Sequence, residues 1–95
     1  MITREQIIQR LENILDPEIG MDIWTMGLIY EIDIKGENSV RIRMTFTSPL
    51  CPAGPYLEEE VKNNLREIGC SNVDIEITFD PPWQPPPALR EALGI

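Results

Sequence analysis

The chain has 95 residues, enough for one domain with a thin hydrophobic core. Its 42% hydrophobic content argues against a disordered segment, and its formal net charge of -8 repels phosphate backbones and anionic membrane surfaces. We therefore expect neither nucleic acid nor a membrane as a partner. The absence of histidine excludes the Ser-His-Asp and Cys-His catalytic arrangements and histidine-ligated zinc.

The first predicted element is a helix that begins after Thr3. Thr3 and Gln6 have the spacing of a capping box, and apolar residues recur at helical spacing as far as Leu15. Pro17 disfavours helical geometry at the residue before it, so the helix should end near Leu15. Residues 16–27 then form an irregular connector, whose length in so small a domain suggests a functional loop.

Three segments alternate between apolar and polar residues and are predicted to be strands: 28–34, 40–46 and 73–79. The turn-forming residues 35–38 predict that the first two strands form an antiparallel hairpin. Thr45 is predicted to face outward. The residues predicted to face the core are Leu28, Tyr30, Ile32 and Ile34, then Val40, Ile42, Met44 and Phe46, then Val73, Ile75, Ile77 and Phe79.

Charges on the outward face predict the order of the strands. The second strand presents Arg41 and Arg43, whereas the first and third present acidic residues. Opposite charges on neighbouring strands stabilise a sheet by about 0.2–1 kcal/mol per pair, so the second strand should be central. A helix predicted over residues 55–68 makes the crossover to the third strand parallel and right-handed. The expected fold is α+β, a two-layer sandwich with a three-stranded mixed sheet and both helices on one face.

Residues 80–95 are predicted to form a stiff, proline-rich tail of the same single domain, 1–95, with a short helix over residues 88–93. Asp80 and Trp83 are its candidate functional residues. Trp83 is expected to close the tail over the end of the sheet, or alternatively to anchor a partner protein.

Cys51 is the main candidate for chemistry. It lies between the second strand and the second helix, beside Pro49 and Pro52, and the N-terminus of a helix favours a thiolate. The alternative is a small buried apolar residue, a common role for a free cysteine. Cys70, at the end of the second helix, is expected to be structural because no residue near it in the sequence activates it.

Asp16 and Glu18 could complete a site with Cys51 if the connector approaches that loop. Thiolate and carboxylate together can hold iron or zinc, whereas one cysteine cannot hold a metal–sulfur cluster alone. We therefore expect no tightly bound cofactor, and a metal held at Cys51 only transiently or shared with a second chain or a partner. The alternative for both acidic residues is a turn with solvated carboxylates.

Five short motifs occur in an order that resembles a known family. They are Leu15-Asp16-Pro17-Glu18, Gly27-Leu28-Ile29-Tyr30, Thr47-Ser48-Pro49-Leu50-Cys51-Pro52, Asp80-Pro81-Pro82-Trp83 and Leu93-Gly94-Ile95. Together they resemble the PaaD-like and SufT-like iron–sulfur cluster assembly proteins, relatives of the N-terminal domain of Mrp-type ATPases. The resemblance implies an α-β-β-α-β core, a role in maturing iron–sulfur proteins, and a Cys51 site lined by Asp16, Glu18 and Thr47.

Two residues depart from the pattern of this family. Thr25 stands where members often carry an acidic residue, and Phe79 stands where a tryptophan is common. The first departure removes one carboxylate from the site that the resemblance implies.

Three functions compete at this stage. The favoured one is a non-enzymatic factor in iron–sulfur protein maturation, by cluster assembly, delivery or client targeting, centred on Cys51. The second is an accessory subunit of a multicomponent oxygenase that hydroxylates an aromatic acyl-CoA, as in phenylacetate degradation. It is less favoured because such relatives are expected to carry a further cysteine-rich C-terminal region. A thiol redox enzyme is least favoured, because no CxxC motif is present.

The expected partners follow from the favoured function and the predicted sheet. The expected protein partners are iron–sulfur client proteins or the assembly machinery. Iron or an iron–sulfur cluster is expected to bind transiently. An open sheet edge also makes a homodimer plausible. A polar start and the lack of a long apolar run lead us to expect a cytoplasmic protein with reduced thiols.

Overall fold

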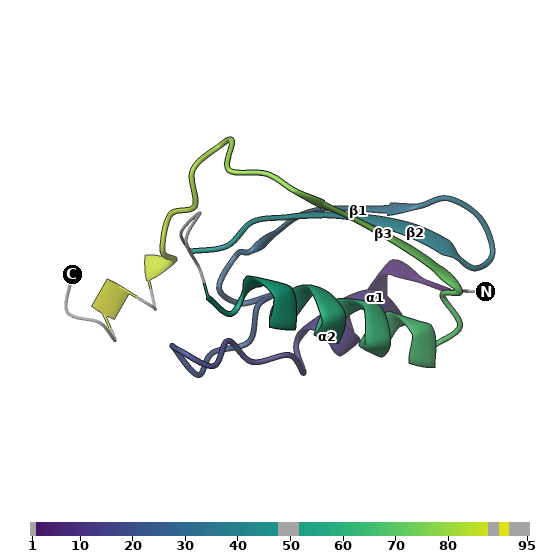
Figure 1. Cartoon of the computed structure of the whole chain (residues 1–95), viewed down its shortest axis with the longest axis horizontal. Coiled ribbons are helices and arrows are strands. Elements are labelled where there is room, and N and C mark those ends of the chain that lie inside the picture. The colour runs from purple at the N-terminus through teal and green to yellow at the C-terminus, as the bar shows by residue number, and fades with distance from the viewer. Residues whose placement is uncertain (1, 48–51, 88–89, 92–95) are drawn as a thin grey trace.

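The computed structural model describes residues 2–47, 52–87 and 90–91, and these form two layers (Figure 1). The elements are α1 (Arg4–Leu11), β1 (Ile29–Ile34), β2 (Ser39–Met44), α2 (Gly54–Glu67) and β3 (Asn72–Ile77). The strands form one sheet in the order β1-β2-β3, and both helices cover the same side of it. The predicted fold class and the central position of the second strand are confirmed.

The register of the sheet explains how the two faces separate. β1 pairs with β2 in antiparallel fashion, and β2 pairs with β3 in parallel fashion. Ile42 lies opposite Ile32 on one side and Ile75 on the other, so the helix-facing surface is apolar. The capping box of Thr3 and Gln6 is also present, and it fixes where α1 begins.

The core lies between the sheet and the helices, and the connector also contributes to it. Ile23, Met26 and Leu28 are fully buried although they lie outside any helix or strand. The fully buried residues of the helices and strands are Ile7, Leu11, Ile42, Met44, Leu57, Val61 and Leu65. No helix within the described residues is long and apolar enough to cross a membrane.

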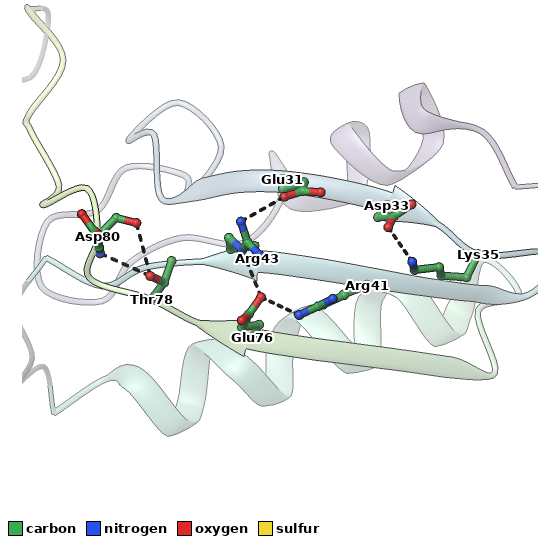
Figure 2. A network of polar contacts seen from close by, with 8 residues as sticks. All are labelled: Glu31, Asp33, Lys35, Arg41, Arg43, Glu76, Thr78 and Asp80. Atoms are coloured by element: carbon green, nitrogen blue, oxygen red, sulfur yellow. Dashed lines mark hydrogen bonds and ion pairs between the residues drawn. The ribbon is translucent and has the colours of Figure 1, made fainter.

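The outer face of the sheet carries a network of charged side chains (Figure 2). One Glu76 oxygen, Oε2, accepts hydrogen bonds from Arg41 at 2.7 Å and from Arg43 Nε at 3.0 Å. Arg43 also reaches Glu31 on the opposite strand, at 3.3 Å. The hydrogen bond from Arg43 lowers the pKa of Glu76, and the charge of Arg41 acts in the same direction. The central arginines therefore tie both edge strands to β2.

Replacing Glu76 with glutamine is expected to reduce stability in a pH-dependent way. The pKa of Glu76 is lower in the folded protein than in the unfolded chain. Glu76 therefore stabilises the fold at pH values above its unfolded pKa, and this stabilisation disappears as the pH falls through its folded pKa. Urea titrations should show a difference between wild type and Glu76→Gln at pH 7 that shrinks in acid. Asp74→Asn, on the same strand and face, is the control and should show a smaller difference, and equal losses would contradict the role of Glu76.

The predicted end of the first helix is wrong: α1 ends at Leu11, not near Leu15. The connector folds back on the residues that follow the helix and forms hydrogen bonds with their backbone groups. The amide of Ile23 donates to the carbonyl of Ile14 at 2.9 Å, and Leu15 pairs with Asp22 as an antiparallel bridge. Hydrogen bonds from a distant segment therefore replace the last predicted helical turn.

The predicted inward position of Tyr30 is also wrong, because β1 contains a β-bulge. Ile29 pairs with Met44, whereas Glu31 pairs with Arg43, so Tyr30 is an extra residue in β1. Ile29 packs against the core in its place.

Thr45 was predicted to face outward, and the structure buries it completely. Its amide donates to the carbonyl of Leu28 at 2.8 Å, and its hydroxyl donates to the carbonyl of Phe46 at 3.3 Å. Thr45 directly follows β2 and pairs with the connector, so this position is buried although the alternating pattern predicts that it faces solvent.

Candidate functional site

The candidate site lies at the end of the sheet where β2 leads to α2. Cys51 falls within residues 48–51, outside the described residues. The structure therefore defines only the segments on either side of it and those packed near them, which are called the frame below. The connector, the start of α2 and the tail all lie at this end of the molecule (Figure 1). The amide of Thr45 meets the carbonyl of Leu28 at 2.8 Å, and the amide of Thr78 meets the carbonyl of Met44 at 2.9 Å. Hydrogen bonds thus join the connector and both strand ends.

The N-terminus of α2 follows Cys51 closely in sequence, and its nearest acidic residues, Glu58, Glu59 and Glu60, lie just beyond its first turn. Its N-cap residue, Ala53, makes no side-chain hydrogen bond, and the first turn contains no acidic residue. Gly54 packs tightly on Phe46, since an added Cβ would lie 2.8 Å from the ring. The positive end of the helix dipole therefore favours an anionic group, such as a thiolate, in front of it.

Asp16 is buried, with 1% of its surface exposed, and it organises the turn of the connector. Its Oδ1 accepts hydrogen bonds from the amides of Glu18 at 2.8 Å and Ile19 at 3.2 Å. The amide of Gly20 donates to the Asp16 carbonyl at 2.7 Å and completes the turn. One oxygen of the carboxylate is thus bound by the backbone. The turn expected as the alternative is present, but the Asp16 carboxylate in it is buried and not solvated.

The other predicted site residues differ in their accessibility. Glu18 has an exposed side chain on the Asp16 turn, and Thr47 is half-buried at the last described position after β2. Asp80 is exposed, and its amide donates to Thr78 Oγ1 at 3.2 Å, while that hydroxyl donates to the Asp80 carbonyl at 3.3 Å (Figure 2). The backbone of Asp80 therefore fixes the start of the tail.

Two hydrogen bonds fasten the tail to this end of the sheet. The indole Nε1 of Trp83 donates to the carbonyl of Met26 at 2.7 Å, and Trp83 packs against the core. The phenol of Tyr30 donates to the carbonyl of Pro81 at 2.8 Å. The part played by Tyr30 was missed from the sequence. Its hydroxyl, a polar group that a core position would leave without a partner, was the available signal.

The end of the tail begins a helical turn. The amide of Arg90 donates to the carbonyl of Pro86 at 2.9 Å, which is the spacing of an α-helix. Most of the predicted helix over residues 88–93 lies outside the described residues.

Cys70 is fully buried, and burial raises the pKa of its thiol. It therefore remains a protonated thiol at neutral pH and acts as a packing residue beneath the end of α2.

The described residues alone do not assemble a metal site. Within residues 2–47, 52–87 and 90–91, no three cysteine or acidic side chains come together in a way that could hold a metal ion.

Comparison with known proteins places this frame in a family. The family model described as "Iron-sulfur cluster assembly protein" matches residues 4–77, from the start of α1 to the end of β3. An "Fe-S protein maturation auxiliary factor" of Porphyromonas gingivalis is 35% identical over 92 residues, 96% of this chain and 88% of the relative. The "Fe-S protein maturation auxiliary factor SufT" of Staphylococcus aureus is 38% identical over 71 residues, 74% of this chain and 81% of the relative.

A solved structure extends this agreement to three dimensions. A conserved hypothetical protein from Thermotoga maritima superposes with a TM-score of 0.87 at 39% identity, covering 99% of this chain and 96% of that one. The sequence match and the shared fold thus cover the same α-β-β-α-β unit. The chain belongs to the family of iron–sulfur cluster assembly proteins.

Proposed function

We propose that this chain is a non-enzymatic auxiliary factor in the maturation of iron–sulfur proteins, acting through Cys51. The observation that carries the maturation role is the similarity over 96% of the chain to a relative named "Fe-S protein maturation auxiliary factor". The lack of histidine supports a role without acid–base catalysis. The oxygenase alternative gains no support from the Porphyromonas gingivalis and Staphylococcus aureus relatives, which are both named as maturation factors.

The proposed site uses one thiolate as a ligand or transfer point for iron or a cluster, which is cargo rather than a resident cofactor. The N-terminus of α2, whose first turn has no acidic residue, supports an anionic Cys51. Glu18 is better suited than Asp16 to supply a carboxylate, because its side chain is exposed while Asp16 Oδ1 already accepts two amides. The remaining ligands would come from a client protein, the assembly machinery or a second copy.

Replacing Cys51 with alanine or serine is expected to abolish the contribution of this protein to client maturation without unfolding it. The measurement is the activity of an iron–sulfur dehydratase in cells that lack the gene and carry each variant. Cys70→Ala is the matched control, because it removes the other thiol from a buried position and should retain function if it folds. Wild-type dehydratase activity in cells that carry Cys51→Ala would contradict the proposed role of this residue.

Binding of the cargo can be measured apart from the cellular effect. Anaerobic titration with ferrous iron and sulfide, followed by absorption spectroscopy, should give a signal with wild type that Cys51→Ser loses. A signal that survives in Cys51→Ser counts against metal binding at Cys51. So does the absence of a signal from wild type when a client protein is present to supply further ligands.

Asp16→Asn and Asp16→Ala separate the structural role of this residue from a ligand role. The alanine variant leaves the amides of Glu18 and Ile19 without their acceptor and should lose about 1–3 kcal/mol of unfolding free energy. The asparagine variant keeps a side-chain oxygen and should lose less than about 1 kcal/mol. We expect Asp16→Asn to mature client proteins normally, and a folded but inactive Asp16→Asn would show that the carboxylate itself is required.

A further inference from the structure

We propose that the open edge of β1 binds an extended segment of a partner protein in which apolar and basic residues alternate, adding it to the sheet as another strand. The proposal goes beyond the Cys51 site and does not depend on it. It rests on the position of β1, on the character of its two faces and on a pocket beside it.

The position of β1 leaves one side of its backbone available. The sheet order places it at an edge, with β2 as its neighbour, and within the described residues no further strand pairs with it. An edge strand of this kind offers unpaired amides and carbonyls to an extended peptide.

The two faces of β1 differ sharply in character. Ile29, Ile32 and Ile34 lie on the helix side, and all three remain partly exposed, Ile34 at 37%. Glu31 and Asp33 lie on the outer side, opposite the arginines of β2. Residues 31–34, which follow the bulge at Tyr30, alternate regularly between the two sides. Side chains of an added strand would alternate in step with them, so its helix-side residues should be apolar and its outer residues basic.

A pocket of about 200 Å³ lies at this edge, and its lining combines apolar with charged side chains. Its lining consists of Arg4, Trp24, Ile29, Tyr30, Glu31 and Ile32. Arg4 lies over the Trp24 ring, 5.8 Å from its centre, and so α1 and the connector close the helix side of the pocket. Pockets of this kind give sequence preference to a strand that the backbone binds without preference.

Charge favours a basic partner strand over a second copy of this chain. Glu31 and Asp33 each contact a cation, Arg43 at 3.3 Å and Lys35 at 2.8 Å, yet their side chains remain 53% and 40% exposed. Each carboxylate therefore has room to accept a second cation. Antiparallel self-pairing centred on Ile32 would instead place Glu31 opposite Asp33 of the other copy, and like charges directly opposite destabilise a sheet.

The test uses a capped nine-residue peptide of alternating valine and lysine, titrated into the full chain. The controls are the same peptide with glutamate for lysine, and the valine–lysine peptide methylated on alternate backbone amides, which cannot add as a strand. Two protein variants complete the design. Asp33→Lys and Asp74→Lys change the net charge equally, but they lie on opposite edges of the sheet.

The valine–lysine peptide should shift the NMR amide signals of residues 31–34 and slow the hydrogen exchange of those amides among them that do not already pair with β2. Asp33→Lys should weaken its binding at least about fivefold, while Asp74→Lys should change it less than about twofold. Equal weakening by both variants, or equal binding of the methylated peptide, would overturn the proposal. So would β1 signals that shift with protein concentration alone, because the edge would then bind a second copy. Binding should persist in Cys51→Ala, so either proposal can fail without the other.

Discussion

Truncation of Ile42 to alanine is expected to lower the free energy of unfolding by about 3–4 kcal/mol. Ile42 is fully buried in the central strand and lies between Ile32 of β1 and Ile75 of β3. A helix layer covers the sheet from one side only, so the core is a single layer thick (Figure 1). The cavity left by the missing atoms cannot close without separating strands that hydrogen bonds hold in register.

Urea unfolding followed by circular dichroism measures this loss. Ile34→Ala is the matched control, because it makes the same chemical change on the same face of the sheet at a position that is 37% exposed. It should cost less than about 1 kcal/mol. If both variants lost the same stability, burial at the centre of β2 would not be the source of the effect.

Truncation of Trp83 to alanine is expected to cost about 2–3 kcal/mol and to release the tail. The loss combines the hydrogen bond to the Met26 carbonyl, worth about 1 kcal/mol, with the packing of the indole against the core. Trp83→Phe keeps a large ring and loses the hydrogen bond, so it should cost only about 1 kcal/mol.

Limited proteolysis provides the second measurement for the tail. Cleavage between residues 80 and 90 should be fast in Trp83→Ala and slow in Trp83→Phe and wild type. Unchanged stability and cleavage in Trp83→Ala would contradict the role of the indole as an anchor. The family match ends at residue 77, before the tail begins. The proteolysis result therefore tests whether Trp83 and Tyr30 hold the tail against the connector and β1, at the end of the sheet where the candidate site lies.

Much of the frame could be predicted from local patterns because the interactions responsible are local or periodic. Thr3 and Gln6 define the start of α1 within a single turn. Alternation of apolar and polar residues identified the strands, and the outward arginines of β2 predicted its central place. The ordered motifs around Cys51 indicated the family that the comparisons establish.

The features that the patterns missed all depend on contacts between distant segments. The carbonyl of Ile14 accepts a hydrogen bond from Ile23, which ends α1 earlier than its periodicity indicates. The bulge at Tyr30 depends on how β1 meets β2, since strand pairing fixes the register.

The sequence by itself determined the element order and the two-faced sheet, because these follow from residue type and spacing, whereas the Cys51 site stays a prediction that the family resemblance implies. The tertiary structure decided that Asp16 organises a turn and that Trp83 and Tyr30 hold the tail. The physical reason is that a backbone carbonyl looks the same in every sequence. Which donor reaches it is settled only when the chain has folded.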